Sequence, residues 1–580
     1  MHLPSAPFPF AADLPPAPRA GLFTTLARID GWGQGAWREI HANWRLRGAL
    51  LAIEDLEADI SRDADDRVVA FVIAFPEQRL GRSAGSESDR ATCDWLLRHV
   101  WTTLLTKPVV TVTTYQPGAA VRATNACRFG PLRASEEPTL ILRLLVRLPL
   151  AGMCCDGKRL ARFLRAIEAF AADLNTSRSR PVLAAERRAV AVQSALRAAL
   201  TTYGLVAFVG NGARLARGGD GGPLAGCKPW RTPVATRMII DLGALGRVRG
   251  LGIRAGVTAV AGAPYHGKST LLAALAAGRE DHPPGDGREL VVADASVLQI
   301  QAEDGRRIKR QDLSLFFARL PGSSPRDFST SRASGATSMG ASLCQGLAAG
   351  CRLLLVDEDT AASNFLTIDP LMRRLLGHAL DGTATLLELL PILSRNGIST
   401  VLVAGSNSLS LAASDRVLLL EDYQPNDVSV RVRRMLGATK IKRSSSAVTM
   451  PSRTLADAPD CLFGPRHFLT VDATEAERPI VNGQALDLRR SGWELDRALV
   501  RGALAAAAWC CRLADGQTLT MSALAERYQT FIGAHGARGL DPFDTALIAV
   551  PPWQLVVSVL ERLERPALSS RPAQLIQRKK

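Results

Sequence analysis

The stretch from Gly262 to Ser269 has the residue types and the spacing of a phosphate-binding loop. It reads GAPYHGKS, which fits the pattern G-x-x-x-x-G-K-[ST], and it lies between the apolar run GVTAV and the helix-prone run LAALAAG. Glycines let backbone N–H groups curve around phosphates, and the N-terminus of the following helix attracts their negative charge. In this pattern Lys268 reaches the β- and γ-phosphates, while the Ser269 hydroxyl binds Mg²⁺. The loop therefore predicts a nucleotide site in which Lys268 is catalytic and Ser269 is a metal ligand.

The whole loop is expected to line this site. Its predicted nucleotide-binding residues are Gly262, Ala263, Pro264, Tyr265, His266, Gly267, Lys268, Ser269 and Thr270. Tyr265 and His266 occupy variable positions of the pattern, so we expect them to set the shape of the loop rather than to take part in the chemistry.

A second group of chemically useful residues follows the apolar run LLLV. Asp357 and Glu358 come directly after this run, in the sequence CRLLLVDEDT. A buried strand that ends in a carboxylate beside a phosphate loop holds Mg²⁺ in P-loop NTPases, which assigns Asp357 to the metal. The next carboxylate can polarise the attacking water, which makes Glu358 the second catalytic residue. The alternative is a capped strand end with solvated acids, and the presence of the phosphate loop disfavours it.

A third group lies upstream of these acids, in RASGATSMGASLCQGLAAGC. Ser334 precedes Asp357 by 23 residues, and a predicted helix over about 339–349 joins them. Here the sequence resembles the ATP-binding-cassette (ABC) class, whose signature Leu-Ser-Gly-Gly-Gln opens a helix at a similar distance. The resemblance implies an ATPase with ATP and Mg²⁺ as cofactors, in which Ser334 and Gly335 bind the nucleotide of another subunit. Positions 336 and 337 depart from the signature, because they hold Ala and Thr rather than Gly and Gln.

More specifically, the chain resembles the soluble predicted ATPases of the ABC class. The shared features are HGKST at the end of the phosphate loop, AEDGR at 302–306, FST followed by ASG-x-TS, and DED followed by Thr. The resemblance is strongest over 235–430 and looser on either side. It implies self-association through the ATPase domain, since a chain with one phosphate loop and one signature needs a second copy to form a shared site.

The loop after the fourth expected strand departs from a typical ABC ATPase. It reads GSN at 405–407, where the class has a switch histidine. This departure predicts slow hydrolysis, or a role for Ser406 or Asn407 in positioning the γ-phosphate.

Two further loops also differ from the class. The loop that bridges opposed subunits usually ends in Asp and would here end at Asn364. The glutamine loop has two candidates at a plausible distance from the phosphate loop, Gln301 and Glu303.

Five apolar strands that alternate with helical patterns must position these residues. They read GVTAVAG, ELVVAD, RLLLVDED, STVLVAGS and RVLLLED. Fully apolar strands separated by helices predict a parallel sheet covered on both faces. We therefore expect an α/β fold with a P-loop ABC-type ATPase core, an α/β N-terminal domain and a mainly helical C-terminal domain. The expected boundaries are an extended leader at 1–20, an N-terminal domain at 21–234, the ATPase domain at 235–430, a basic linker at 431–455 and the C-terminal domain at 456–580.

The charge of the chain favours polyanionic partners. It has 71 Lys and Arg against 55 Asp and Glu, a net charge of +16, which suits RNA or DNA first and an anionic membrane surface second. Basic residues cluster at 306–310, at 431–453 and in the terminal RKK. Aromatic residues make up only 5% of the chain and no RRM-type stacking motif occurs, so no nucleic-acid-binding fold is recognised.

Other classes of protein are disfavoured. No apolar run reaches the length of a membrane span, and the N-terminus lacks the pattern of a signal peptide, so we expect a cytoplasmic protein without a membrane span. The ten cysteines form no CxxC pair, which disfavours a zinc site.

Three functions fit these observations. The first and favoured one is a homodimeric ATPase that hydrolyses Mg-ATP and closes on RNA or DNA. The second is a nucleotide-gated interaction or scaffold protein with slow or no turnover, which the missing switch histidine favours. The third is a P-loop phosphotransferase, which the signature at Ser334 disfavours because a kinase does not need one.

Overall fold

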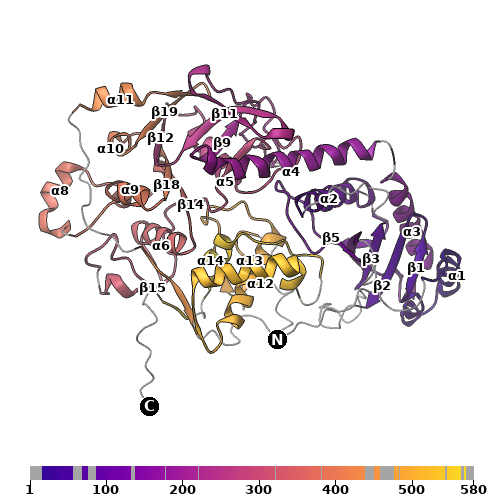
Figure 1. The fold of residues 1–580 in the computed structure, drawn as a ribbon. Coiled ribbons are helices and arrows are strands. Elements are labelled where there is room, and N and C mark those ends of the chain that lie inside the picture. Colours follow the sequence, from indigo (N-terminus) through magenta and orange to yellow (C-terminus); the bar gives the residue numbers. More distant parts are fainter. Residues whose placement is uncertain are drawn as a thin grey trace, which may run out of the picture.

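The structure is a computed structural model of the chain. It describes residues 16–55, 68–75, 86–106, 108–131, 138–174, 176, 178–219, 221–320, 322–380, 382–437, 450–456, 476–481, 484–541, 545–563 and 567–569. In Figure 1 the N-terminal elements (indigo) lie on one side, and the elements around the predicted phosphate loop (magenta to orange) lie on the other. The C-terminal helices (yellow) pack below and between them. Within these ranges no helix is long and apolar enough to cross a membrane.

A six-stranded sheet forms the centre of the predicted ATPase domain. Its order is β14–β17–β18–β12–β19–β20, in which the first five strands are parallel and β20 runs antiparallel to β19. The strands are β12 (Val257–Ala261), β14 (Leu298–Ile300), β17 (Leu353–Asp357), β18 (Ser399–Ala404), β19 (Arg416–Glu421) and β20 (Gln424–Asp427). Four of the five predicted strands therefore lie in the predicted parallel sheet.

The fifth predicted strand, ELVVAD, belongs to a different sheet. It forms β13 (Val291–Ala293), which pairs antiparallel with β9 (Leu205–Gly210). Val291 and Ala293 pack in one apolar cluster, whereas Val292 packs in another. Because β13 is buried on both faces, its composition is the same as that of a parallel strand. The place predicted for it is taken by the short strand β14.

Helices cover both faces of the parallel sheet, as its apolar strands require. Along β17, Leu353 and Leu355 join the cluster of α5 (Lys268–Ala277), and Leu354 and Val356 join the cluster of α6 (Gly335–Ala348) and α9 (Leu386–Arg395). Successive side chains of a strand point to opposite faces. The helices α5 and α6 therefore lie on opposite sides of the sheet.

An antiparallel sheet crosses the boundary predicted at 234/235. Its order is β10–β11–β9–β13, with β10 (Arg237–Asp241) and β11 (Arg247–Arg254). The long helix α4 (Ser179–Thr202) packs on it through Leu196 and Leu200. Because β9 and α4 precede residue 235 yet share their core with β11 and β13, this unit begins earlier in the chain than the sequence predicted.

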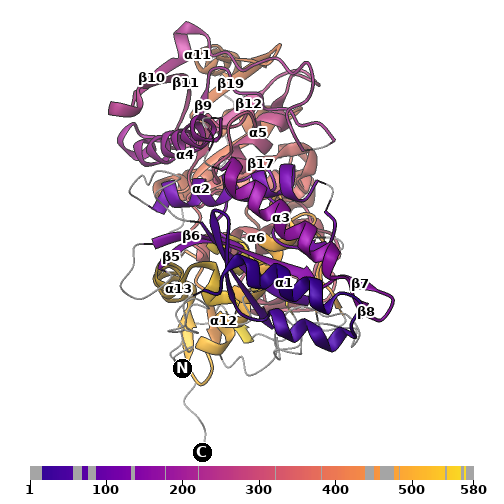
Figure 2. The same cartoon turned by 90° about the vertical axis from the view of Figure 1, so that its right-hand side faces the viewer.

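The N-terminal domain is an antiparallel sheet with helices on one face. The strand order is β1–β2–β3–β6–β4, and β5 also pairs with β6. The strands are β1 (Asn43–Leu46), β2 (Ala49–Asp55), β3 (Val68–Phe75), β4 (Thr111–Thr113), β5 (Cys127–Pro131) and β6 (Pro138–Arg147). The helices are α1 (Arg19–Ile29), α2 (Ser86–His99) and α3 (Gly157–Asp173). Figure 2 shows α1 and α3 side by side on this sheet, with the hairpin of β7 (Leu150–Ala151) and β8 (Cys154–Cys155) at their end.

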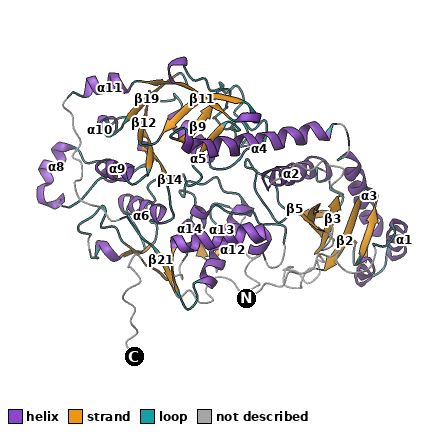
Figure 3. Ribbon diagram, in the orientation of Figure 1, coloured by secondary structure: helices purple, strands orange, loops and turns teal. Residues whose placement is uncertain are grey.

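The C-terminal domain is mainly helical where it is described (Figure 3). It contains α12 (Arg497–Leu513), α13 (Met521–His535), α14 (Trp553–Leu560), and a small sheet of β21 (Thr454–Ala456), β24 (Thr518–Thr520) and β25 (Ala567–Ser569). The predicted linker at 431–455 begins inside helix α11 (Ser429–Leu436) and ends inside β21, and its middle lies outside the described residues. Its two ends are therefore structured elements rather than a connector.

The remaining described α-helices and strands are short. They are β15 (Ile308–Gln311), β16 (Phe328–Thr330), α7 (Ser363–Leu366), α8 (Pro370–Leu376), α10 (Ser408–Ala412), β22 (Ile480–Val481) and β23 (Gln484–Ala485).

Candidate functional site

The predicted phosphate loop joins β12 to α5, and its two glycines are required by the backbone. Gly262 has φ +152°, and a Cβ there would stand 2.6 Å from the carbonyl oxygen of Leu420. Gly267 has φ +90° and is the N-cap of α5, and a Cβ there would stand 2.9 Å from the ring of Tyr423. Because Gly267 has no side chain, the first N–H groups of α5 remain available to an anion.

The side chain of Lys268 folds back onto the phosphate loop. Lys268 Nζ donates to the carbonyl oxygens of Gly262, at 2.8 Å, and Ala263, at 2.9 Å. Both acceptors are uncharged, so a phosphate brought to the loop offers this ammonium a stronger partner. Ser269 is exposed on the first turn of α5, and Thr270 is half-buried behind it.

Two loop residues have other surroundings. Tyr265 is 96% exposed and has φ +66°, so it forms the tip of the loop. The ring nitrogen Nδ1 of His266 accepts a hydrogen bond of 2.8 Å from the backbone N–H of Asp422, which ties the loop to the end of β19. Pro264, which precedes Tyr265, is also exposed.

The register of the sheet places the acidic residues at the same edge as the loop. Asp357, at the end of β17, is paired with Val403 of β18, and Ala261, at the end of β12, is paired with Ala404. The two strand ends thus flank β18 at two strand spacings, about 10 Å. Asp357 is 4% exposed, and one of its oxygens accepts a bond from the backbone N–H of Asp359. A carboxylate and a hydroxyl are hard-oxygen ligands of the kind that Mg²⁺ binds, and Asp357 ends one strand and Ser269 follows another at this edge of the sheet.

Glu358 is held by the loop that follows β18. Its Oε2 accepts a 2.7 Å bond from the backbone N–H of Gly405, and its Oε1 accepts a 2.7 Å bond from the hydroxyl of Ser406. Asn407 instead caps α10, because its side-chain oxygen accepts from the N–H of Leu409. Of the two residues considered as substitutes for a switch histidine, only Ser406 contacts the second acid.

Ser334 and Gly335 lie away from the phosphate loop of the same chain. Ser334 is the N-cap of α6, and its hydroxyl accepts a 3.3 Å bond from the N–H of Thr337. The atoms closest to a Cβ built on Gly335 belong to Ala302, Ala362 and Asp304 rather than to the loop. Since α5 and α6 also pack on opposite faces of the sheet, one copy of the chain does not bring these two groups together (Figure 1).

The two candidates for the glutamine position have different surroundings. Gln301 directly follows Ile300, which is paired with Val356, so Gln301 lies beside the acidic end of β17. Glu303 is buried and accepts bonds of 2.7 and 2.6 Å from Arg562. Burial raises the pKa of Glu303, but the charges of Arg562 and Arg306 outweigh burial, and its pKa is lowered. The geometry therefore favours Gln301 at the nucleotide edge.

A pocket of about 240 Å³ next to the phosphate loop was not predicted from the sequence. His266, Gly267 and Thr270 form one wall. The rest comes from Tyr423 and from the segment 215–230, including Lys228 and Trp230. Lys228 Nζ is 2.7 Å from an oxygen of Asp422 and 5.6 Å from the centre of the Tyr423 ring. Tyr423 lies two residues after the end of β19, and an aromatic residue in that position is too common to predict a pocket from the sequence.

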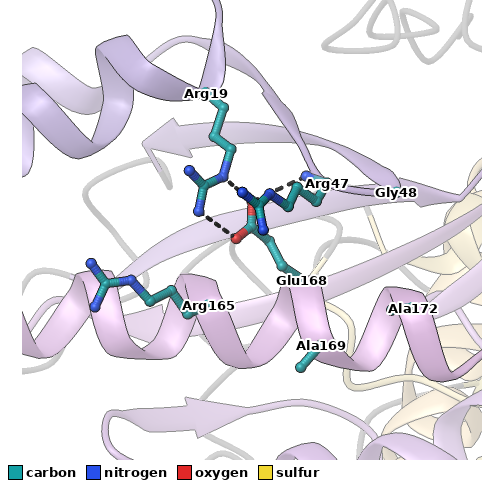
Figure 4. Close-up of a pocket in the computed structure, with 7 residues that line it drawn as sticks. All are labelled: Arg19, Arg47, Gly48, Arg165, Glu168, Ala169 and Ala172. Carbon is teal, nitrogen blue, oxygen red and sulfur yellow. Dashed lines mark hydrogen bonds and ion pairs between the residues drawn. The ribbon is translucent and has the colours of Figure 1, made fainter.

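A second pocket, of about 640 Å³, lies in the N-terminal domain (Figure 4). Arg19 holds Glu168 through two bonds of 2.6 and 2.9 Å, and Glu168 also accepts from the backbone N–H of Arg47. Arg165 lies one turn before Glu168 on α3. Burial raises the pKa of Glu168, but the bond from Arg19 contributes to lowering it overall. Three arginines and one carboxylate line this pocket, which leaves it with a positive charge.

Comparison with known proteins identifies the domain that carries the first site. Residues 180–455 match the family model ABC_ATPase, described as a P-loop domain. Uncharacterized protein MJ1628 of Methanocaldococcus jannaschii is 31% identical over 256 residues, which are 41% of this chain and 55% of that protein. The chain thus aligns with about half the length of this curated relative.

Two solved structures are similar to part of the chain. One is cbiO1 of Clostridium perfringens, part of the ABC transporter complex cbiONQ, with 14% identity over 40% of this chain and 91% of that one, at a TM-score of 0.25. The other is MJ1267, an ATP-binding cassette of an ABC transporter in its ADP conformation, with 13% identity over 40% and 95%, at a TM-score of 0.24. The family match starts at residue 180, close to the start of α4, and includes the phosphate loop, both acids and Ser334. The chain therefore carries a P-loop domain of the ABC ATPase family.

Proposed function

We propose that this chain is a homodimeric ATPase that hydrolyses Mg-ATP and closes on nucleic acid. The observation that carries the ATPase part is the register of the parallel sheet, which sets the loop 262–269 and the acids Asp357 and Glu358 on either side of the end of β18. Phosphate-binding backbone, a metal-binding carboxylate and a second carboxylate near the phosphates are the parts that phosphoryl transfer to water needs.

Each part has a role in this proposal. Lys268 exchanges two carbonyl acceptors for the β- and γ-phosphates, and Ser269 and Asp357 hold Mg²⁺. The bound metal neutralises negative charge on the phosphates. The pocket beside His266 takes the base and ribose, since its apolar and aromatic walls suit a flat ring.

Glu358 acts on the attacking water. Its two oxygens accept bonds from Gly405 and Ser406, which fix the direction of the carboxylate. Three donors occupy this carboxylate, namely the N–H of Gly405 and the N–H and hydroxyl of Ser406. A carboxylate has about four lone-pair sites, so it can still accept a bond from water. We therefore assign Glu358 as the base and Ser406 as the residue that positions it.

The separation of Ser334 from the phosphate loop supports a dimer. The ATP-capping role implied for Ser334 and Gly335 can be fulfilled only if they face the nucleotide of another copy. A two-fold dimer pairs each loop with the other copy's α6, so one interface creates two equal sites.

The arginine pocket supports a nucleic-acid partner. Arg47 and Arg165 line this pocket together with Arg19, whose guanidinium is bonded to Glu168. Guanidinium forks bind phosphate oxygens in pairs, so Arg47 and Arg165 suit phosphate groups. The net charge of +16 adds a long-range attraction for a polyanion. On α11, Arg431, Arg433 and Arg434 present a second exposed cationic face.

The ATPase part is tested by release of inorganic phosphate from Mg-ATP. The wild-type chain is expected to turn over, and Glu358→Gln is expected to reduce kcat at least about 100-fold while ATP affinity is retained. Asp359→Asn is the matched control, because Asp359 is exposed and only its backbone contacts Asp357. Equal rates for Glu358→Gln and wild type would contradict the assignment.

The nucleic-acid part is tested by the salt dependence of binding to an RNA and a DNA of mixed sequence. Replacing both Arg47 and Arg165 by Gln removes two phosphate contacts, so the slope of log affinity against log salt should fall by about 2. Arg395→Gln is the control for one lost charge, since Arg395 is exposed on α9. Binding that is absent at about 50 mM salt would exclude the clamp.

The second function, a nucleotide-gated interaction protein with slow or no turnover, is favoured by one observation. The loop at 405–407 offers Glu358 hydrogen-bond donors but no histidine. If the wild-type chain binds ATP yet releases phosphate no faster than Glu358→Gln, this function replaces the first.

A further inference from the structure

An arginine-rich cleft of about 510 Å³ lies between the ATPase domain and the C-terminal domain. It is formed by the segment 303–307 and Ser331 on one side, and by 485–490 and Arg562 on the other. Five arginines and three carboxylates line it. The cleft therefore has an excess of positive charge and suits an anion.

Most of the charged groups in this cleft bind each other. Arg562 makes two bonds to Glu303, and Arg489 makes two bonds to Asp487. Arg306 is buried and donates to Glu303 and Ser342. These groups form the walls of the cleft rather than its binding surface.

Arg490 is different because it is exposed and bonds an uncharged group. Its Nη1 donates to the carbonyl oxygen of Ala302, at 2.7 Å. A guanidinium has five N–H donors in a planar fork, so this anchor fixes the group while leaving donors for a ligand.

This anchor places Arg490 beside the start of α6. Ala302 Cβ is 3.1 Å, and an oxygen of Asp304 is 3.4 Å, from the position that a Cβ on Gly335 would take. The carbonyl that Arg490 binds thus belongs to a residue in contact with the N-terminal turn of α6.

The first turn of α6 itself offers no cation. Its residues 335–338 are Gly, Ala, Thr and Ser. Thr337 is buried, and its hydroxyl bonds the hydroxyl and the carbonyl oxygen of Ser334. Thr337 therefore cannot reach across to another copy, as the Gln at this position in the signature would have to do.

We propose that Arg490 binds the phosphates of the ATP held by the second copy of the chain. This inference rests on the homodimer proposed above. In that dimer the N-terminus of α6 faces the other copy's phosphates, and Arg490 supplies the side-chain charge that α6 lacks. An arginine–phosphate fork is a strong charge-assisted contact.

The test mixes two impaired variants of the full-length chain. Lys268→Ala lacks its own phosphate contact but keeps Arg490, and Arg490→Gln has the converse defect. If Arg490 acts on the other copy's nucleotide, each mixed dimer contains one complete site, so mixing raises phosphate release above that of either variant alone. If Arg490 acts within its own copy, no complete site forms and mixing restores nothing, which overturns the inference.

Further variants separate this contact from a loss of structure. Arg490→Gln should bind ATP as a monomer with unchanged affinity, and its kcat should fall at least about tenfold. Arg490→Lys should recover part of the rate, since a lysine keeps the charge but not the fork. Arg489→Gln, which removes the neighbouring charge bound to Asp487, should retain activity.

Two outcomes distinguish this inference from the proposed function. If Glu358→Gln does not dimerise with ATP, the homodimer is wrong and the inference falls with it. If the dimer forms but Arg332→Gln, rather than Arg490→Gln, shows the defect and the complementation, the dimer stands and Arg490 is the wrong residue; Arg332 is exposed two residues before Ser334.

Discussion

The starts of α5 and α6 are built in opposite ways. The N-cap of α5 is Gly267, in a left-handed conformation and without a side chain, so the N–H groups of its first turn face the loop unblocked. The N-cap of α6 is Ser334, whose hydroxyl already accepts from Thr337. The N-terminus of α5 can therefore bind an anion through its backbone N–H groups alone. At the N-terminus of α6 one of these N–H groups is already hydrogen-bonded to Ser334, so an anion there needs additional donors.

The two helices also differ in what holds them. α6 is joined to the C-terminal domain through Gln345, whose amide donates to Glu561. Glu561 in turn accepts two bonds from Arg453, at 2.8 and 2.7 Å, and the side chains of this pair are 0% and 1% exposed. The C-terminal domain is thus bonded to α6 and also lines the cleft containing Arg490, whereas the loop before α5 is bonded to the end of β19 through His266.

The largest expected effect comes from breaking the ion pair between Arg453 and Glu561. Glu561→Gln leaves the buried Arg453 without its charged partner, which should lower the free energy of unfolding by about 3 kcal/mol. The midpoint of the urea transition of the intact chain measures this change. Glu421→Gln, at an exposed carboxylate, should change the free energy by less than about 0.5 kcal/mol. Equal midpoints for the two variants would show that α6 is not held in this way.

The next effect concerns α5 alone. Lys268→Ala removes an ammonium that can form charge-assisted bonds to phosphate, so ATP affinity should fall about 10- to 100-fold. Titration calorimetry with Mg-ATP measures it. Lys158→Ala, in the N-terminal domain, is the control for lost charge. Unchanged affinity for Lys268→Ala would mean that the loop is not the phosphate site.

The sequence predicted the α5 side of this comparison better than the α6 side. Gly262, Lys268, Asp357 and Glu358 lie in short motifs at the ends of apolar strands, and parallel strands bring such ends to one edge. Ser406 and Asn407 were the two alternatives for positioning the γ-phosphate, and the bond of Ser406 to Glu358 was not predicted, because a one-residue difference in a loop decides which side chain faces the acid.

Long-range contacts could not be predicted in this way. Arg490 and Ala302 are 188 residues apart, and the loop before Trp230 meets Tyr423 only through the fold. The strand β13 was assigned to the wrong sheet because burial on both faces gives parallel and antiparallel strands the same composition. The boundary predicted at 234/235 followed a Gly-rich loop, although β9 before that loop pairs with β11 after it.

A smaller effect is expected from removing the hydrogen bond between Ser406 and Glu358. Ser406→Ala removes one hydrogen bond to Glu358, worth about 1 kcal/mol, so phosphate release should slow about fivefold. Affinity for ATP should not change, because Ser406 contacts the acid rather than the loop. Ser414→Ala is the control, since its hydroxyl only bonds the carbonyl of Ser410. A normal rate in Ser406→Ala would remove its positioning role.

The smallest effect tests the self-contained start of α6. Thr337→Val keeps the shape of the side chain and removes its hydroxyl bonds to Ser334, so stability should fall by about 1 kcal/mol or less. ATP-dependent dimerisation should be unaffected if Thr337 does not reach the other copy. Loss of the dimer in this variant, with normal stability, would assign Thr337 to the interface and weaken the contrast between the helices.

The central claim is that the N-terminus of α5 in one copy and the N-terminus of α6 in another copy come together only in a dimer, with ATP bound between them. Light scattering of Glu358→Gln with and without Mg-ATP tests it most directly, because slowed hydrolysis keeps the nucleotide in place. The account predicts a monomer without ATP and a mass twice as large with it, and no such change when Lys268→Ala is added. A chain that binds ATP and remains a monomer at all protein concentrations would contradict the account.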